Sequence, residues 1–364
     1  MEATVIENPL VSLVGKLKEQ QVAKKDIVVP AGYISYSGVD GLLTVGEDSM
    51  KVSDYAHQQI ADKLEIPRSY YKKMQSGYPE LLEQNVNMWL SRKEKTKYLL
   101  RTFNYADKDN ICRALLSDRY NILDNMDVLV CALEAIKETG VHVEIVKAEV
   151  SDTNMYIHVV APEIHVEATD LLDGYLQNRS SAITGRGIIS GMVISNSEVG
   201  NGTFEISARA QILQCKNGMH DRNAKFRKVH LGGKLEEGIQ WSQNTKNKNY
   251  ELIMSQVSDS VKVYLSKDYL GQLTDKLRKA KEVEVEHPAG MIERVSNELL
   301  IPETHRNSIL NYYMKDGDLS GLGIVHAVTR TTQHMGVDAQ FEIESSLFSL
   351  IPRLKQFDKP ISKN

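Results

Sequence analysis

Short stretches of apolar residues, separated by turn sequences, characterise the middle of the chain. Residues 97–105 and 111–120 flank the sequence ADKDN, and this pattern predicts a β-hairpin. Residues 141–150 and 155–162 flank the sequence SDTN and predict a second hairpin. Both hairpins indicate antiparallel pairing of neighbouring strands.

The clearest pair of strands lies between residues 189 and 215. ISGMVISNS (189–197) is joined through EVGNG to TFEISARAQILQC (203–215). In the second stretch apolar and polar residues alternate, which predicts one buried and one solvated face. The apolar set is Phe204, Ile206, Ala208, Ala210 and Ile212, and the polar set is Glu205, Ser207, Arg209 and Gln211. The following CKNGM carries an Asn-Gly turn signal.

Helical periodicity is found toward both ends. Residues 54–90 and most residues after 249 have it, and a further helix is expected from Asp124 or Asn125 to about Glu138, where Gly140 ends it. The sequence therefore predicts an α+β fold: a central antiparallel sheet built from hairpins, an N-terminal helix pair and a helical C-terminal region. The expected regions are 1–92 (short strands and helix pair), 93–248 (β-rich core with one helix) and 249–364 (helical).

The segment from Tyr55 to Met74 has the spacing of two helices packed at a steep angle. A helix-turn-helix that reads a DNA groove has the same spacing, but Glu65 occupies the turn position that normally requires glycine. The L-x-I-P sequence at residues 64–67 is repeated at residues 299–302, ahead of a helix with a poor surface for phosphate. We therefore interpret both segments as structural helix pairs, with groove reading as the alternative.

Composition excludes several classes of protein. The chain has 364 residues, of which 41% are hydrophobic and 25% charged, as in ordinary globular proteins. No stretch of about 18 apolar residues predicts a membrane helix, and the N-terminus lacks the pattern of a secretory signal. The three cysteines lie far apart. We expect a cytoplasmic protein without a disulfide framework, a zinc site or a cofactor.

Local clusters of basic residues are the main functional signal, because the net charge of the whole chain is −4. One cluster spans residues 209–234 and the other spans residues 92–119. A basic sheet face or loop with aromatic residues binds single strands through phosphate charge and base stacking. The candidate nucleic-acid-binding residues are Arg209, Lys216, Arg222, Lys225, Phe226, Arg227, Lys228, Lys234, Arg101, Arg113 and Arg119. Ordinary solvated surface is the alternative interpretation.

Four segments together resemble the phage- and plasmid-type family catalogued as domain of unknown function 932. They are residues 55–74, the hairpin at 99–125, the block at 191–219 and the helix at 323–335. The most specific sequences are SDRY (117–120), SNSEVG (195–200) and CKNG (215–218). The family-type residues in the last two are Asn196, Ser197, Glu198, Gly200, Asn217 and Gly218. The resemblance implies carriage by a mobile element and a cytoplasmic location, without an established activity.

These observations predict a non-enzymatic nucleic-acid-binding protein of a mobile element, which binds or anneals single-stranded DNA in replication or recombination. One alternative is a module that binds a host protein, in counter-defence or regulation. The other is a metal-dependent nuclease or phosphohydrolase around Glu198, His220, Asp221 and His230, whose spacing matches no familiar metal motif. The sequence leaves open whether DNA or RNA is bound and whether the chain forms a homo-oligomer.

Overall fold

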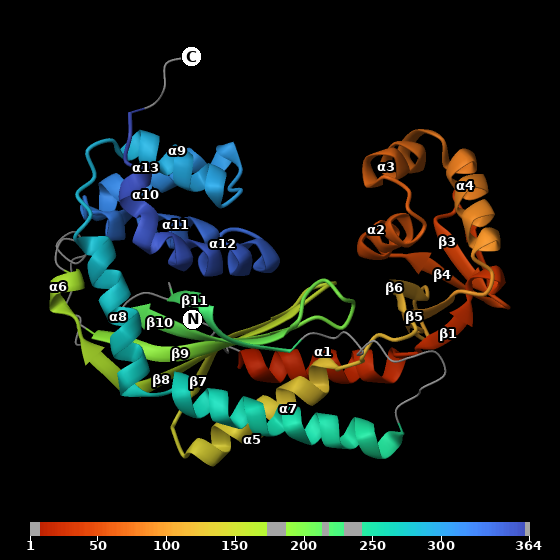
Figure 1. The fold of residues 1–364 in the computed structure, drawn as a ribbon, viewed down its shortest axis with the longest axis horizontal. Helices are drawn as coiled ribbons and strands as arrows, with labels where there is room; N and C mark the ends of the chain where they lie inside the picture. The colour runs from red at the N-terminus through yellow and green to blue at the C-terminus, as the bar shows by residue number, and fades with distance from the viewer. Residues whose placement is uncertain (1–7, 173–186, 213–217, 229–241, 361–364) are drawn as a thin grey trace, which may run out of the picture.

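Two β-sheets and the helices that cover them make up the computed structural model, which describes residues 8–172, 187–212, 218–228 and 242–360 (Figure 1). Strands and helices are mixed along the chain and the sheets are built largely from antiparallel neighbours, so the predicted α+β class is confirmed. Within these described residues, no helix is long and apolar enough to span a membrane.

The N-terminal body is a six-stranded sheet covered by three helices. Its strand order is β1-β5-β6-β4-β3-β2; β4 and β6 are parallel and the other neighbours are antiparallel. The strands are β1 (Ile27–Pro30), β2 (Ile34–Ser37), β3 (Leu42–Val45), β4 (Asp48–Val52), β5 (Lys97–Phe103) and β6 (Ile111–Ser117). The helices are α2 (Asp54–Lys63), α3 (Arg68–Gly77) and α4 (Pro79–Arg92).

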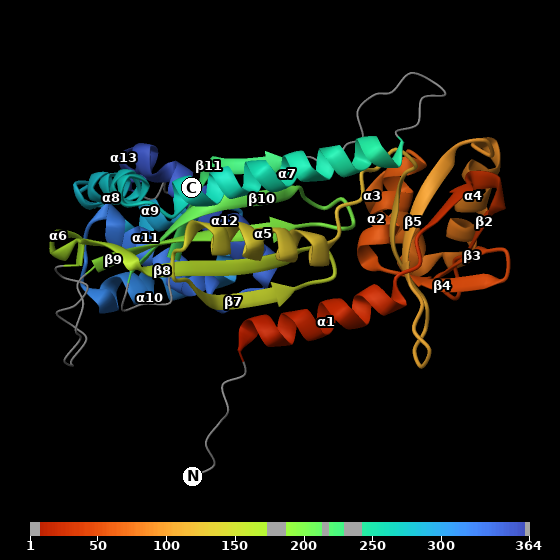
Figure 2. The same cartoon turned by 90° about the horizontal axis from the view of Figure 1, so that it is seen from below.

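The central body is a five-stranded antiparallel sheet between two helical layers. Its strand order is β11-β10-β9-β8-β7. The strands are β7 (Glu144–Val150), β8 (Met155–Glu167), β9 (Gly187–Asn196), β10 (Phe204–Ile212) and β11 (Gly218–Lys228). One layer, seen from below in Figure 2, consists of α1 (Pro9–Ala23), α5 (Asn125–Thr139) and α7 (Gln243–Tyr264).

The second helical layer comes from the C-terminal part of the chain. Its helices are α8 (Lys267–Lys281), α9 (Pro288–Glu298), α10 (Arg306–Asp316), α11 (Gly321–Thr332), α12 (Val337–Leu350) and α13 (Leu354–Phe357), and the short α6 (Thr169–Leu172) follows β8. In Figure 1, α11 and α12 lie over the sheet face opposite α1, α5 and α7. Side chains of the sheet and of both layers share one hydrophobic core.

The three predicted hairpins are confirmed. Strand β5 pairs with β6, β7 with β8 and β9 with β10, each in antiparallel register. The predicted middle helix is also present as α5, and Gly140 ends it with a φ of 69°, a left-handed conformation that glycine adopts at low cost. The turn expected at residues 215–219 lies mostly outside the described residues.

The repeated L-x-I-P sequence forms the same helix ending twice. Glu65 and Leu300 have φ values of 61° and 54°, respectively. In the first copy the N–H of Ile66 donates to the carbonyl of Ala61 at 2.9 Å, and in the second Ile301 donates to Ser296 at 2.8 Å. This is the Schellman pattern that usually requires glycine. The absence of glycine at residue 65 therefore does not prevent the turn.

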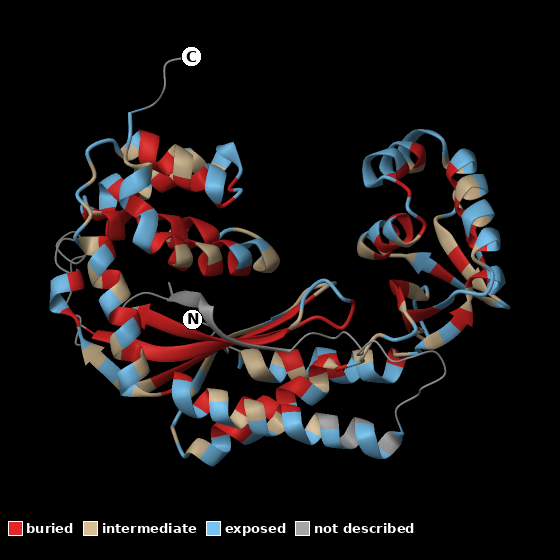
Figure 3. Cartoon of the chain, in the orientation of Figure 1, coloured by how far each residue is buried: buried red, intermediate tan, exposed pale blue. Residues whose placement is uncertain are grey.

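One prediction about β10 is wrong. Phe204, Ile206, Ala208 and Ala210 are buried as expected, and the side chain of Ile212 lies outside the described set. The alternate residues, Glu205, Ser207, Arg209 and Gln211, are buried as well rather than solvated. Figure 3 shows β8, β9 and β10 buried along most of their length. The reason is that α12 covers the second face, where Phe341 packs on Tyr156 with 4.6 Å between ring centroids.

The structure also groups the chain differently from the three expected regions. Strands β5 and β6 belong to the N-terminal sheet, although the expected first region ends at residue 92. Helices after residue 249 share a core with the central sheet, where Leu277 and Val328 join Ile206. The central sheet and the C-terminal helices therefore pack as one unit.

Candidate functional site

Six charged side chains meet where the N-terminal body joins the central body, and we call this cluster the charged joint. Its members are Lys24, Asp26, Arg101, Arg113, Asp124 and Glu198. They come from the end of α1, from the segment between α1 and β1, from β5 and β6, from the start of α5 and from the β9–β10 turn. Three cations and three carboxylates are thus brought together from distant parts of the sequence.

Glu198 occupies the middle of the charged joint, and its side chain is 3% exposed. Oε2 accepts a hydrogen bond from Nη1 of Arg113 at 2.9 Å. Oε1 accepts from the backbone N–H of Asn125 at 2.7 Å and from Nζ of Lys24 at 3.3 Å. Because Asn125 is the first residue of α5, the carboxylate also meets the positive end of that helix.

Arg101 is fully buried and reaches both bodies. Its Nη1 donates to the carbonyl oxygen of Glu198 at 3.0 Å, and its Nη2 donates to Oδ1 of Asp124 at 2.6 Å. The same nitrogen lies 3.1 Å from Oδ2 of Asp26. A buried guanidinium is tolerated only with such partners, because an unpaired buried charge is very costly.

The surroundings of Glu198 keep it ionised. Burial alone would raise the pKa of this carboxyl, but the charges of Arg113, Lys24 and Arg101 outweigh burial and hold its pKa below the ordinary value. The pKa of Asp124 is also lowered, because Arg101 and Lys24 outweigh its burial. The joint is therefore a fixed arrangement of opposite charges at neutral pH.

The other family-type residues of the β9–β10 turn hold this loop against its neighbours. Asn196 donates through Nδ2 to the carbonyl of Leu123 at 3.0 Å and to Oδ1 of Asn125 at 2.9 Å. Ser197 donates through Oγ to the carbonyl of Thr153 at 2.8 Å. Gly200 has a φ of 80°, which explains glycine at that position. These contacts are structural.

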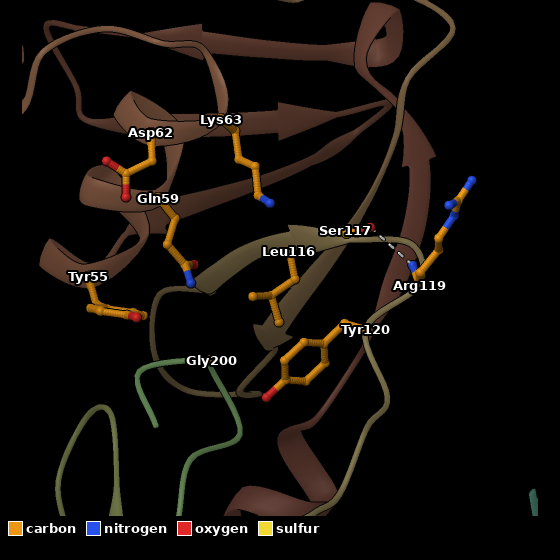
Figure 4. A pocket seen from close by; sticks show the side chains of 9 residues that line it. All are labelled: Tyr55, Gln59, Asp62, Lys63, Leu116, Ser117, Arg119, Tyr120 and Gly200. Atoms are coloured by element: carbon orange, nitrogen blue, oxygen red, sulfur yellow. Dashed lines mark hydrogen bonds between the residues drawn. The ribbon is translucent and has the colours of Figure 1, made fainter. Parts of the chain in front are cut away.

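A pocket of about 520 Å³ lies beside the joint (Figure 4). The N-terminal body supplies most of its wall, and the β9–β10 turn supplies Gly200. Its lining residues are Tyr55, Gln59, Asp62, Lys63, Leu116, Ser117, Arg119, Tyr120 and Gly200. In Figure 4, Tyr55, Leu116 and Tyr120 border the pocket, and the Arg119 side chain extends away from the pocket centre. We call this cavity the tyrosine pocket.

Most polar side chains of the tyrosine pocket are held in place. Gln59 donates to the carbonyl of Val199 at 2.8 Å and accepts from the N–H of Leu115 at 2.9 Å, so its amide links the two bodies. Asp62 accepts from Nε of Arg68 at 2.8 Å, and this hydrogen bond lowers the pKa of the Asp62 carboxyl. The pocket walls are therefore preorganised.

Cations without a carboxylate partner among the described residues gather next to the pocket. Tyr98 pairs with Ser117, which places Lys97 and Arg119 at the same end of the β5–β6 hairpin. Lys63 and Arg119 line the pocket, and Lys95 lies two residues before β5. We call the set Lys63, Lys95, Lys97 and Arg119 the basic hairpin end. Lys93, by contrast, is paired with Glu65 at 2.8 Å. Two exposed acids, Glu94 and Asp118, share this region, so the unpaired charge is net positive.

The structure corrects three of the candidate nucleic-acid-binding residues. Arg101 and Arg113 are 0% and 8% exposed and belong to the charged joint. Arg209 is 3% exposed beneath α12, where its guanidinium donates to Nδ1 of His158 and its charge interacts with Glu344. None of the three faces solvent, so they are not available to phosphates in this conformation. Arg119 is exposed and belongs to the basic hairpin end.

The basic segment after β10 is described only in part. Strand β11, which pairs with β10, carries Arg222, Lys225, Phe226, Arg227 and Lys228. Only the backbone of these residues is described, and Arg227 is the register partner of Glu205. Gly218 is the first residue of β11. Lys216, Asn217 and Lys234 lie outside the described residues.

The described residues provide no metal site for a nuclease or phosphohydrolase. Glu198 is engaged in the charged joint, and His220 and Asp221 lie on β11, where only the backbone is described. His230 lies outside the described residues. Among described residues, no group of three or more His, Cys, Asp or Glu side chains could hold a metal ion.

Sequence reasoning missed Tyr55, Lys63, Lys97 and Tyr120 as site residues, although the sequence YAHQQIADKL, the basic cluster at 92–119 and SDRY contain them. Their signal is weak, because only the fold brings α2, the hairpin end and the β9–β10 turn together. A clearer signal was present for the joint: Arg101 and Arg113 each stand inside an apolar strand sequence, which indicates a buried charge with partners.

Comparisons of the chain with models of protein families, with curated proteins and with solved structures found no match. The resemblance to domain of unknown function 932 therefore stays a prediction. Its three most specific sequences nevertheless map to defined places: SDRY to the tyrosine pocket, SNSEVG to the charged joint and pocket, and the final Gly218 of CKNG to the start of β11.

Proposed function

We propose that this protein binds nucleic acid without chemical turnover, and that the basic hairpin end contacts its phosphates. The observation that carries the proposal is the gathering of Lys63, Lys95, Lys97 and Arg119 without carboxylate partners among the described residues. Neutralising phosphates with such cations releases bound counterions and drives binding whatever the sequence. Single-strand binding or annealing in the replication or recombination of a mobile element is the process we propose for it.

Electrostatics at this site supports the proposal better than the overall composition does. The chain carries a net charge of −4, so attraction for a nucleic acid has to come from a local group of cations. At the hairpin end, the acids Asp62 and Glu65 are already paired with Arg68 and Lys93. The attraction of the unpaired cations is therefore not cancelled by these acids.

Binding of a labelled oligonucleotide at low salt tests the proposal. The variant Lys97→Ala/Arg119→Ala should bind oligonucleotides of every sequence more weakly, because phosphate contacts carry no sequence information. The control Lys262→Ala/Lys267→Ala removes two exposed cations at the junction of α7 and α8 and should bind like wild type. Equal losses in the two variants, or no binding by wild type, would remove the proposal.

Binding to a host protein is the second candidate, and one observation favours it. Helix α4 exposes Leu81 and Met88, 44% and 58% exposed, on its outer side. Exposed apolar side chains grouped on one helix are typical of protein interfaces. Association with a host protein that resists added salt and is lost in Leu81→Ser/Met88→Ser would favour this function over nucleic-acid binding.

A further inference from the structure

We infer that the tyrosine pocket holds one unpaired nucleobase, so that the bound nucleic acid is a single strand. This inference rests on the proposed function and adds which class of ligand the tyrosine pocket binds. A volume of about 520 Å³ falls within the range of small-molecule sites and has room for a nucleobase. A base inside a duplex cannot enter such a pocket without leaving its partner.

The aromatic lining of the pocket suits a base. Tyr55 comes from the first turn of α2 and Tyr120 follows β6, and both rings pack on the small cluster formed by Leu99, Leu116 and Val199. The position of Tyr120 is fixed, since its hydroxyl donates to the carbonyl of Ser197 at 3.1 Å. Stacking on fixed aromatic rings is tolerant of sequence, because every base has a π-face.

The cations are placed for a strand rather than for a free base. Lys63 lines the pocket, whereas the side chain of Arg119 extends away from the pocket centre (Figure 4). Lys97 lies further along the same end of the hairpin. A base in the pocket therefore has neighbouring phosphates along the basic hairpin end. A mononucleotide carries only one phosphate and uses fewer of these charges.

The β9–β10 turn completes the pocket through Gly200. A Cβ atom added at Gly200 would lie 2.9 Å from Cδ2 of Leu116 and 3.6 Å from Cε2 of Tyr120. Glycine thus allows the β9–β10 turn to pack closely against these two side chains. Because the turn is held by the charged joint, both bodies contribute to the cavity.

The test compares a single strand, the duplex of the same sequence and a nucleoside monophosphate at one salt concentration. Wild type should bind the single strand at least roughly 10-fold more tightly than the other two, a ratio within the range of one stacked base. Tyr55→Leu removes the ring but keeps an apolar side chain, and should lower this preference roughly 10-fold. Tyr55→Phe retains the ring and should keep the preference for the single strand.

Each contrary result has a distinct meaning. Suppose that wild type binds the single strand and the duplex equally while Lys97→Ala/Arg119→Ala still weakens binding of both. This result would overturn the base pocket and leave the proposed function standing. Tyr55→Leu that binds single strands as wild type does, with an unchanged melting temperature, would also overturn it. If the nucleoside monophosphate binds as tightly as the single strand, the inference that the ligand is a strand is overturned. Wild type that binds none of the three ligands would remove both proposals.

Discussion

The carboxylate of Glu198 and the guanidinium of Arg113 form a buried ion pair, 2.9 Å from Oε2 to Nη1, between the two bodies of the protein. Glu198 lies in the turn between two strands of the central sheet, and Arg113 lies on β6 of the N-terminal sheet. Since the same turn carries Gly200 of the tyrosine pocket, this pair supports the geometry of the proposed site as well as the fold.

Removing Glu198 should destabilise the protein strongly. Glu198→Ala leaves the buried charges of Arg113 and Lys24 without this partner, and breaking a buried pair costs about 3–5 kcal/mol. Urea unfolding measures the change. The matched control, Glu251→Ala on the exposed side of α7, should change the free energy of unfolding by no more than about 0.5 kcal/mol. Similar values for the two variants would show that the joint contributes little.

Stability should fall in acid partly through Glu198. The pKa of this carboxyl is lower in the folded protein than its ordinary value, so the unfolded chain binds its proton at a higher pH. The stabilisation is thus complete above the unfolded pKa, about 4.3, and is lost as the pH falls through the folded pKa. Glu198→Gln should flatten the decline in unfolding free energy below about pH 4. An identical acid profile in wild type and variant would contradict this.

Leu300→Gly should stabilise the protein. Leu300 has a φ of 54° and is 87% exposed, so its backbone is strained and its side chain buries little surface. Left-handed backbone costs a residue with a side chain about 1–2 kcal/mol, and glycine loses part of this gain through its unfolded-state entropy. We expect a net gain of roughly 0.5–1 kcal/mol in thermal or urea unfolding. A lower melting temperature would mean that Leu300 makes a stabilising contact.

The helix pair α2–α3 should behave as a packing unit. Leu64 is buried, and Leu64→Ala should cost about 2–5 kcal/mol, as core truncations do. Lys72→Ala/Lys73→Ala removes two exposed charges and should change stability by no more than about 0.5 kcal/mol. A sequence-specific footprint on duplex DNA that disappears in the lysine variant would instead support groove reading.

Local patterns predicted the strands and helices well, because each depends on neighbouring residues. The alternation in residues 203–212 identified β10 and its pairing with β9, and Gly140 correctly marked the end of α5. The burial of Arg209 could not be predicted in this way, since it depends on α12, more than a hundred residues further along the chain. Alternation shows which residues share a face, and only tertiary packing decides whether that face is solvated.

The candidate site was less predictable than the fold. Arg119 was found from its charge, whereas Arg101 and Arg113 have the same charge and are buried at the joint. Basic composition alone cannot separate a cation that faces solvent from one paired with a distant carboxylate such as Glu198. The tyrosine pocket required three segments to converge, and no spacing in the sequence indicates that convergence.

The salt dependence of single-strand binding tests the central claim most directly. Each neutralised phosphate adds about 0.7 to the slope of log affinity against log salt for single strands. If Lys97 and Arg119 each contact a phosphate, Lys97→Ala/Arg119→Ala should lower the magnitude of the slope by about 1.4, with the folded state intact by circular dichroism. The same slope in wild type and in this variant would contradict the account. The absence of binding by wild type at low salt would contradict it as well.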